Sequence, residues 1–412
     1  MLRNVIVIND HAAINGGQAK VAIQSAVGLA AAGLNVVFFA GSGPVAEELT
    51  TAGVRVECLG QSDIGSNPSR LQAMAQGVWN RTAAHRLRDV LRAFDAADTI
   101  VHCHGFAKLL SGAIGAVLTR QPIPVVLTMH EYALACPNGG FFHYPDNRIC
   151  TRRPLGLSCL STNCDSRRAA FKAWRIARQI AINGPGNMPR GLTDIISISP
   201  TQRRVMQPYL HGARLHHVGN PVDAERRPPA PVATNDAFIL IGRLSKEKGC
   251  ALFAEAAQQA GVPAIFVGEG EERDTIARIN PQAVITGWQT PAQVMDWIDR
   301  ARAVVFSSLW YECQPLVPLE AQARGVPVIV GSWGAAADQI IDDVDGIHLR
   351  HPDATALAEV LRDLTGTRAA TLGSEGYRRF WQSPPTRDAH VAALLAVYAD
   401  VRSRRECEPV AR

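Results

Sequence analysis

Residues 237–249 read AFILIGRLSKEKG, an apolar run that passes directly into a charged loop bounded by Gly242 and Gly249. The run 237–242 is typical of a buried parallel strand, and residues 250–259 continue with helical periodicity. A strand, a short loop and a helix in this order begin a βαβ unit. The stretch therefore predicts an α/β protein whose ligands lie at the carboxyl ends of parallel strands.

The same alternation extends along the whole chain. It restarts after the turn NPVD at residues 220–223, which indicates two Rossmann-like, doubly wound halves. Residues 226–231 (RRPPAP) are proline-rich and lack periodicity, as an interdomain linker would. The expected strands are 5–8, 35–39, 54–58, 99–102, 125–129 and 194–199 in the first half, and 237–242, 263–267, 283–286, 303–307 and 327–330 in the second.

Helical stretches complete these units and set the expected domain boundaries. We predict one domain at 1–215, a second at 216–378 and a C-terminal helical segment at 379–412. The expected helices are 18–32, 83–94, 109–118, 250–259, 292–299, 316–324 and 390–401.

Composition excludes several classes of protein. With 47% hydrophobic and 19% charged residues in 412, the chain can bury two cores, and disorder is excluded as its main state. No apolar run approaches the roughly 18 residues needed to cross a bilayer. The N-terminus is typical of a strand rather than a signal peptide, so we expect a cytoplasmic protein with reduced thiols. The net charge is +5, and the basic residues lack the aromatic interleaving of a nucleic-acid binder, so no nucleic-acid partner is expected.

Two glycine-containing loops could hold an anion. Gly16 and Gly17 open the helix at 18–32, where backbone N–H groups and the helix dipole favour negative charge, although such pairs are often mere turns. Arg243 and Lys248 follow the strand at 237–242, and an arginine fork matches phosphate oxygens. A solvated charged turn is the alternative for this second loop.

Polar motifs follow three further strands. His130-Glu131 follows the strand at 125–129, and residues 267–270 (VGEG) end the strand at 263–267. Glu312 follows the strand at 303–307, and Glu320 lies two helical turns beyond it. In a chain with 37 acidic residues this spacing alone decides nothing, but both carboxylates can face the crevice at the carboxyl edge of the sheet.

Taken in order, these motifs and the turn at 220–223 resemble glycosyltransferase family 4 over nearly the whole chain. The resemblance implies the GT-B architecture, in which two Rossmann-like domains face each other across a cleft. The N-terminal domain would take the acceptor, the C-terminal domain would bind the nucleotide sugar, and the last helix would cross back. The implied activity is transfer of a sugar from a nucleotide-diphosphate donor to a glycan or lipid-linked acceptor, with retention of anomeric configuration and no cofactor.

Carried onto this sequence, the resemblance gives each matching residue an expected role. Arg243 and Lys248 would hold the diphosphate and neutralise the leaving group. Glu320 would accept hydrogen bonds from the ribose, Glu312 would sit near the donor sugar, and His130 would contact that sugar beside the reacting centre. The expected catalytic residues are His130, Arg243, Lys248 and Glu312, and the other expected donor contacts are Gly16, Gly17, Gly242, Gly268, Leu316 and Glu320.

Two rival functions use the same scaffold. A nucleotide-sugar epimerase would consume the donor without any acceptor. A non-catalytic sugar-nucleotide-binding subunit would not need the cations and carboxylate at Arg243, Lys248 and Glu320, whose presence argues against it.

A cluster of four cysteines marks a loop-like segment at 136–164. Cys136, Cys150, Cys159 and Cys164 suit a structural tetrahedral zinc site, although their gaps are not CxxC pairs, and free thiols or disulfides are the alternatives. The segment resembles an insert in family 4 enzymes of bacterial surface polysaccharide assembly, which places it on the acceptor side. His102 and His104 also invite a metal interpretation, but a polar strand tip lining the cleft is the favoured alternative.

The positive charge is concentrated next to this insert. Residues 148–178 contain eight basic side chains and one acid. At helical spacing Arg168, Lys172, Arg175 and Arg178 share one face, with Trp174, Ile176 and Ile180 opposite. Such a helix could lie peripherally on an anionic membrane, and the alternative is a solvated basic face.

Overall fold

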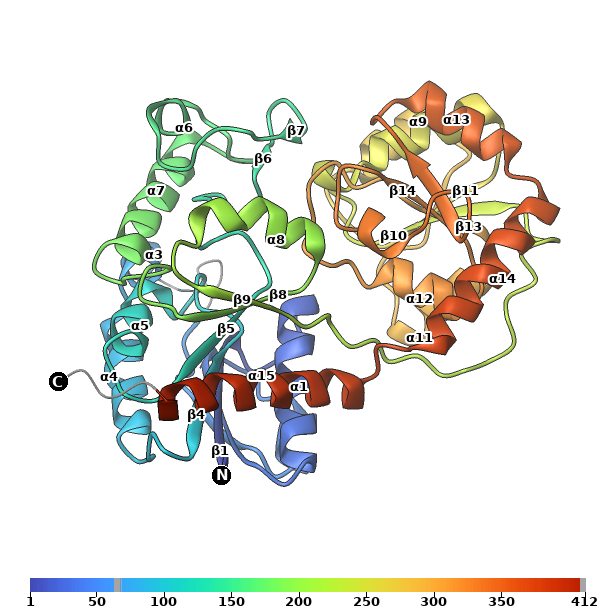
Figure 1. Cartoon of the computed structure of the whole chain (residues 1–412). Coiled ribbons are helices and arrows are strands. Elements are labelled where there is room, and N and C mark those ends of the chain that lie inside the picture. Colours follow the sequence, from blue (N-terminus) through green and yellow to red (C-terminus); the bar gives the residue numbers. More distant parts are fainter. Residues whose placement is uncertain (63–66, 68, 408–412) are drawn as a thin grey trace.

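The computed structural model describes residues 1–62, 67 and 69–407, which form two parallel sheets flanked by helices (Figure 1). The first sheet has seven strands, all in parallel pairing, in the order β3-β2-β1-β4-β5-β8-β9. Its strands are β1 (Asn4–His11), β2 (Asn35–Ser42), β3 (Arg55–Cys58), β4 (Thr99–Cys103), β5 (Val125–Met129), β8 (Asp194–Ser197) and β9 (Arg214–His217).

Alternating residues of this sheet supply two separate cores. Ile6 and Ile8 point into a cluster with helices α4 and α5, whereas Val5 and Val7 point to the opposite face, toward α1 and the C-terminal helix. This two-residue alternation is the expected geometry of a strand covered on both faces. The helices of this half are α1 (Gly17–Ala31), α2 (Glu47–Thr51), α3 (Arg70–Val78), α4 (Arg81–Leu91), α5 (Ser111–Leu118), α6 (Leu157–Ser161), α7 (Ala169–Asn183) and α8 (Pro200–Met206), and a short hairpin joins β6 (Phe142–His143) to β7 (Arg148–Ile149).

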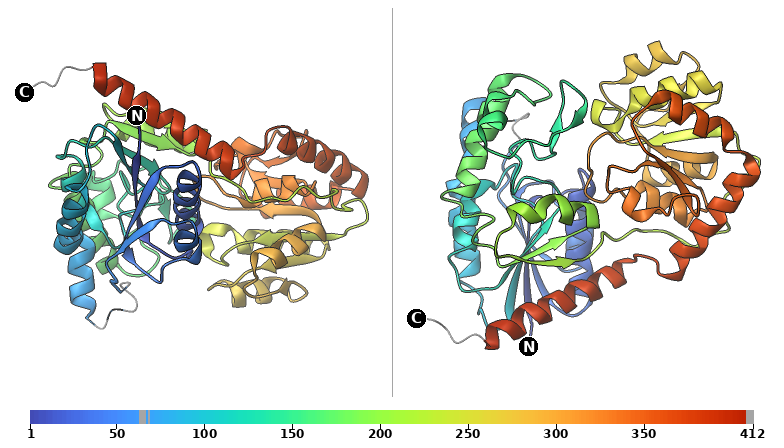
Figure 2. Two further views of the ribbon diagram at one scale, coloured as in Figure 1. Left: turned by 90° about the horizontal axis from the view of Figure 1, so that it is seen from below. Right: turned by 45° about the horizontal axis from the view of Figure 1, so that its top comes forward.

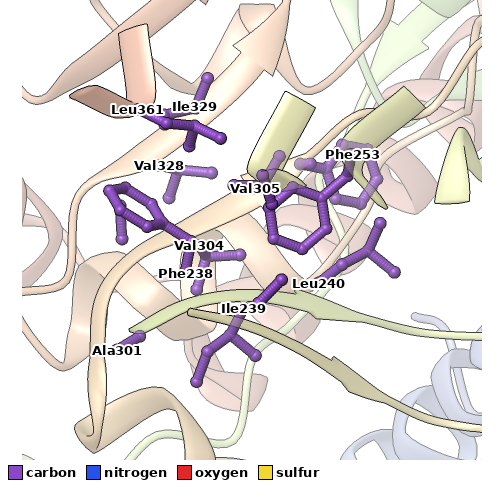
Figure 3. Close-up of a cluster of buried hydrophobic side chains, with 14 of the residues drawn as sticks. Phe238, Ile239, Leu240, Phe253, Ala301, Val304, Val305, Val328, Ile329 and Leu361 are labelled. Carbon is purple, nitrogen blue, oxygen red and sulfur yellow. The ribbon is translucent and has the colours of Figure 1, made fainter. Parts of the chain in front are cut away.

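The second sheet has six parallel strands in the order β12-β11-β10-β13-β14-β15. Phe238 and Leu240 pack with Phe253 in its core (Figure 3), as the apolar run at 237–242 predicts. The strands are β10 (Ala237–Ile241), β11 (Ala264–Val267), β12 (Val284–Ile285), β13 (Ala301–Phe306), β14 (Val328–Gly331) and β15 (Gly346–Leu349). The helices that follow β10 are α9 (Cys250–Ala260), α10 (Arg273–Ile279), α11 (Pro291–Asp299), α12 (Val317–Ala323), α13 (Ala354–Asp363), α14 (Gly366–Gln382) and α15 (Arg387–Cys407). Two 3-10 turns, η2 (Lys246–Lys248) and η3 (Ala337–Gln339), belong to this half, and η1 (Gln207–Tyr209) follows α8 in the first half.

The prediction of an α/β protein with two Rossmann-like halves is confirmed, with two strands added to the parallel sheets and the small β6–β7 hairpin beside them. β9 and β15 lie at sheet edges, and the sequence of β9, Arg-Leu-His-His, carries polar side chains that do not read as an apolar run. Charged and polar residues are common on edge strands, because those strands are buried on fewer sides.

The last helix returns to the first half. α15 packs beside α1 (Figure 2), where Val391, Leu394 and Tyr398 join the same core as Val5 and Val7. The predicted domain bounds at 215 and 378 stay a prediction. Among the described residues, no helix combines the length and apolar character needed to cross a bilayer.

Candidate active site

A cavity of about 150 Å³ lies between the two halves, at the carboxyl ends of their strands. Each half supplies part of its wall, because α1 and the loop after β5 meet the loop between β13 and α12. Four predicted residues line this cavity together: Gly17, His130, Glu312 and Leu316. The other lining residues are Gln18, Glu131, Gly139, Ile198, Asn220, Trp310, Cys313 and Gln314.

Lys248 joins the site through Glu312. Its Nζ lies 2.5 Å from Glu312 Oε1, and the same oxygen accepts a hydrogen bond from Ser308 Oγ at 2.8 Å. Burial alone would raise the pKa of Glu312, but the charge and hydrogen bond of Lys248 hold it below its usual value. The carboxylate is therefore ionised and directs the ammonium toward the cavity.

Glu312 also has an unusual backbone. Its φ of 53° lies in the left-handed region, which a non-glycine residue adopts at a cost of about 1–3 kcal/mol. The hydroxyl of Tyr132 donates to the Glu312 carbonyl at 2.5 Å, and Tyr132 is fully buried in the other half of the molecule. The first half thus fixes the backbone of a carboxylate carried by the second.

Arg243 does not reach the cavity. Its side chain is 68% exposed, and its guanidinium donates to Glu247 at 2.5 Å and to Ser245 at 3.3 Å. The loops of Gly242 and Gly268 touch each other beside it, since a Cβ on Gly268 would lie 2.0 Å from the Gly242 carbonyl oxygen. These three predicted residues form the rim at the ends of β10 and β11.

The N-terminus of α1 is open to an anion. Gly16 is the N-cap of this helix, and a Cβ added at Gly16 or Gly17 would meet no atom within 4 Å. Free backbone N–H groups at a helix start favour negative charge. Gly17 lines the cavity, and Gly16 lies just outside its wall.

Glu320 lies on α12, outside the wall of the cavity, near Lys20 and Asp223. Those two residues pair at 3.7 Å. Burial raises the pKa of Glu320, Lys20 opposes that rise and Asp223 adds to it. Lys20 belongs to α1, so this carboxyl also lies where the two halves meet.

His130 is held by a chain of buried histidines. Its Nε2 lies 2.9 Å from His104 Nδ1, and the two rings stack at 5.2 Å. His102 in turn contacts Thr128 at 2.7 Å and the hydroxyl of Tyr398 at 2.6 Å. Burial lowers the pKa of His130 to about 3 and holds those of His102 and His104 well below their usual value. The imidazole of His130 is therefore neutral at pH 7. His102 lies on β4 and His104 directly follows it, and both are buried and line no part of the catalytic cavity.

These histidines predict acid-sensitive stability. Burial lowers the pKa of His102, His104, His130 and His390 in the folded chain. Below the ordinary histidine pKa of about 6.5, these histidines are therefore protonated in the unfolded chain but still neutral in the folded chain. Their contribution is complete above about pH 6.5 and is lost as the pH falls. Buried carboxyls with raised pKa values, Glu131 and Glu320, work in the opposite direction. We expect a net loss of about 2 kcal/mol in the free energy of unfolding between pH 6.5 and 5.5, measured by urea denaturation. A constant or rising stability over this interval would contradict the neutral histidine cluster.

The predicted zinc site is not supported. Across residues 1–62, 67 and 69–407, no three His, Cys, Asp or Glu side chains form a group that could hold a metal. All four thiols of the segment 136–164 are free. Cys159 and Cys164 instead flank Lys172, whose Nζ lies 3.6 and 3.2 Å from their sulfurs. Lys172, a buried lysine of α7, ties this loop to the domain.

The predicted basic face of α7 is turned inward only in part: Lys172 and Arg178 are buried whereas Arg168 is exposed, and membrane contact through residues 148–178 stays a prediction. Lys172 and Arg178 are 4% and 7% exposed, whereas Ile180, expected on the apolar face, is 56% exposed. Arg178 donates to the carbonyls of Ala107 and Pro137, and Arg175 pairs with Asp165 at 2.7 Å. Lys172, Arg175 and Arg178 thus contact thiol, carboxylate and carbonyl groups in and around the insert.

Sequence reasoning missed several polar residues of the cavity. Gln314 accepts the backbone N–H of Asn220 at 2.5 Å, and Asn220 Oδ1 is buried without a hydrogen-bond partner among the described residues. The ring of Trp310 lies 5.8 Å from Lys248 Nζ, close enough for a cation–π contact. Trp310 and Gln314 follow the strand β13, and this position at a carboxyl end was the signal that could have found them.

Two family models match the chain. The model described as "Glycosyl transferase 4-like domain" matches residues 16–179, and that described as "Glycosyl transferases group 1" matches residues 235–366. Together they cover more than two thirds of the chain, one in each half. The chain is a glycosyltransferase. Its cavity lies between the two matched segments, so both contribute residues to the site.

Solved structures show the fold of this glycosyltransferase. A glycosyltransferase from Rickettsia africae is 12% identical, with a TM-score of 0.67 over 97% of this chain and 98% of that one. The Anabaena HepE protein in complex with UDP and glucose is 16% identical, also with a TM-score of 0.67, over 97% of this chain and 100% of that one. The predicted GT-B architecture is thereby confirmed.

A curated relative extends the similarity in sequence. The D-inositol 3-phosphate glycosyltransferase of Xylanimonas cellulosilytica is 25% identical over 363 residues, which are 82% of this glycosyltransferase and 78% of the relative.

Proposed function

We propose that this glycosyltransferase transfers a sugar from a nucleoside-diphosphate sugar to a glycan or lipid-linked acceptor, with retention of anomeric configuration, in the assembly of a bacterial surface polysaccharide. The observation that carries the proposal is the cavity in which the open N-terminus of α1 faces the Lys248–Glu312 pair. A helix start and an ammonium are the groups that stabilise a departing diphosphate. The UDP and glucose held by the Anabaena neighbour support a nucleotide sugar as the donor.

The proposed reaction breaks one bond, forms one bond and transfers one proton. The bond between the anomeric carbon and the diphosphate oxygen breaks, and the acceptor hydroxyl oxygen bonds to the same face of that carbon. The hydroxyl proton passes to the departing diphosphate, whose charge Lys248 and the Gly17 amide stabilise. Burial keeps His130 uncharged, and in the proposed reaction its neutral imidazole hydrogen-bonds the sugar. Glu312 positions Lys248 and is not assigned the role of nucleophile.

The decisive experiment is a panel of nucleotide sugars. A thermal-shift screen identifies the donor, because a ligand that binds the folded state raises its melting temperature. Incubation with that donor and candidate acceptors should then release nucleoside diphosphate, and NMR of the product should show the anomeric configuration of the donor. Conversion of the donor to another sugar nucleotide without acceptor would identify an epimerase instead, and binding without any turnover would identify a non-catalytic subunit.

Glu320 gives a test of the nucleotide position. If Glu320 accepts hydrogen bonds from the ribose, Glu320→Gln should weaken UDP binding by about 1–3 kcal/mol, measured by isothermal titration calorimetry. The control is Glu255→Gln, which changes an exposed carboxylate on the outer helix α9 and should leave the affinity unchanged. Equal UDP affinity in wild type and Glu320→Gln would place the ribose elsewhere.

A further inference from the structure

A second cavity, of about 310 Å³, opens beside the candidate active site. It is bounded by the hairpin region of the insert, by α8 with the turn that follows it, and by one residue of the second half. Its aromatic wall consists of Phe141, Tyr209 and Tyr311, and its basic wall of Arg152 and Arg204. We call it the insert cavity. The insert cavity takes no part in the donor site proposed for this enzyme.

One loop contributes to both the insert cavity and the catalytic cavity. Tyr311 lines the insert cavity, and the next residue, Glu312, lines the catalytic cavity. Tyr132 packs edge-on against Phe141 at 5.5 Å and donates to the Glu312 carbonyl. Phe141 in turn stacks on Tyr209 at 5.7 Å. A molecule seated in the insert cavity therefore contacts Tyr311, the neighbour of Glu312, and Phe141, which packs on the tyrosine that holds the Glu312 backbone.

The two guanidinium groups of the insert cavity have no carboxylate partner within 4.0 Å among the described residues. Arg204 donates to Thr201 Oγ1 at 2.9 Å, and the nearest hydrogen-bond partner of Arg152 is Cys150 Sγ at 3.8 Å. Asp338 is linked to Arg204 only through Thr201. Its carboxylate oxygens accept hydrogen bonds from the backbone N–H and the hydroxyl of Thr201.

Two other arginines in or near the insert are paired. Arg148 pairs with Asp146 at 2.9 Å, and Arg175 pairs with Asp165. Arg152, Arg204 and the exposed Arg153 have no such ion pair among the described residues, and of these three Arg152 and Arg204 line the insert cavity. Guanidinium donors bind phosphate and carboxylate oxygens strongly, and aromatic rings provide a flat apolar surface for the remainder of a ligand.

We propose that the insert cavity binds the acceptor and selects one that carries an anionic group, a phosphate or a carboxylate. Arg152 and Arg204 hold the anion, while Phe141, Tyr209 and Tyr311 contact the uncharged part. The proposal rests on the proposed function, since it names the acceptor class of the same reaction. It gives the insert a task beyond its own folding.

Calorimetry on the UDP-saturated enzyme tests the proposal, because UDP occupies the donor site and leaves the insert cavity for the probe. The probes are glucose, glucose 6-phosphate and glucuronic acid. We expect at least one anionic probe to bind about tenfold or more tightly than glucose, as charge-assisted hydrogen bonds would produce. Preference for glucose 6-phosphate indicates a phosphate acceptor, and farnesyl phosphate then tests a lipid-borne phosphate. Preference for glucuronic acid indicates a uronic acid. Equal affinity for all three sugars would overturn the proposal.

Matched variants assign the effect to the cavity. Arg204→Gln and Arg152→Gln should each weaken the anionic probe by about tenfold. Arg203→Gln, at an exposed neighbouring position of α8, and Arg148→Gln, at an exposed position of the hairpin, should not. Unchanged affinity in Arg204→Gln and Arg152→Gln would contradict the assignment. UDP affinity and thermal stability are measured in every variant. Loss of UDP binding would contradict the proposed function, whereas loss of anionic-probe binding with UDP binding intact concerns the insert cavity alone.

Discussion

Replacing Lys248 by methionine is expected to lower kcat for sugar transfer by about 10²–10³-fold, the size of effect seen when one preorganised charge-stabilising donor is removed. Lys248 Nζ is the cation that Glu312 holds at the cavity, at 2.5 Å. Charge develops on the diphosphate as the sugar leaves, so the ammonium is worth more in the transition state than in the bound donor. The loss should therefore appear mainly in kcat and less in KM.

The same substitution should be visible at Glu312. Burial is the largest single influence on this carboxyl and raises its pKa, so removing the charge and hydrogen bond of Lys248 should raise that pKa, while hydrogen bonds from Ser308 and Trp310 still oppose the rise. Methionine preserves most of the length of the side chain, so packing against Phe306 and Trp310 is largely kept.

Lys246→Met provides the matched control for Lys248. Lys246 lies in the same short turn, η2, but its side chain is exposed, whereas that of Lys248 is paired with Glu312. Steady-state kinetics with the donor that the thermal-shift screen identifies should show a near-wild-type rate for Lys246→Met. If Lys248→Met and Lys246→Met lost activity equally, the turn would act through bulk charge and the assignment of Lys248 would be wrong.

The buried strands could be predicted from the sequence, because burial on both faces leaves continuous apolar runs. β5 was predicted at 125–129 and is found as Val125–Met129. β9 escaped prediction because an edge strand needs no such run. Carboxyl ends of parallel strands meet at one edge, so Gly17 and His130 could be placed together on the first sheet, and the resemblance to glycosyltransferase family 4 placed Glu312 across the cleft from them.

Side-chain direction was harder to predict. Arg243 and Lys248 looked equivalent in the sequence, yet Glu247 holds the first in solvent and Glu312 holds the second in the cleft. Likewise, the basic stripe of α7 looked solvent-facing until the insert supplied thiol and carbonyl partners for Lys172 and Arg178. Helical spacing shows which residues share a face, but the partners of that face come from tertiary structure.

Gly249→Ala is expected to reduce both stability and activity, whereas Gly261→Ala is expected to reduce stability only slightly. The two glycines cap the two ends of α9 with nearly the same backbone, φ 70° and ψ 30° against φ 68° and ψ 32°. An alanine in this left-handed conformation costs roughly 1–2 kcal/mol at either position. Conformational strain is therefore matched between the two variants.

Their surroundings are not matched. A Cβ on Gly249 would lie 2.1 Å from the backbone oxygen of Ser307, whereas a Cβ on Gly261 would meet no atom within 4 Å. Relief of this overlap must move either the end of β13 or the turn that carries Lys248, and such overpacking adds about 1–3 kcal/mol or more. Ser307 Oγ also donates to the carbonyls of Lys248 and Gly249, so either movement disturbs the position of Lys248.

Urea denaturation and steady-state kinetics on the two variants separate strain from steric overlap. We expect Gly261→Ala to lose about 1–2 kcal/mol and to retain its activity, and Gly249→Ala to lose about 2–5 kcal/mol together with most of its kcat. Equal losses of stability would mean that the contact with Ser307 is relieved freely. A stable, fully active Gly249→Ala would mean that catalysis does not depend on the close approach of this turn to β13, and therefore that Lys248 is not held there for the reaction.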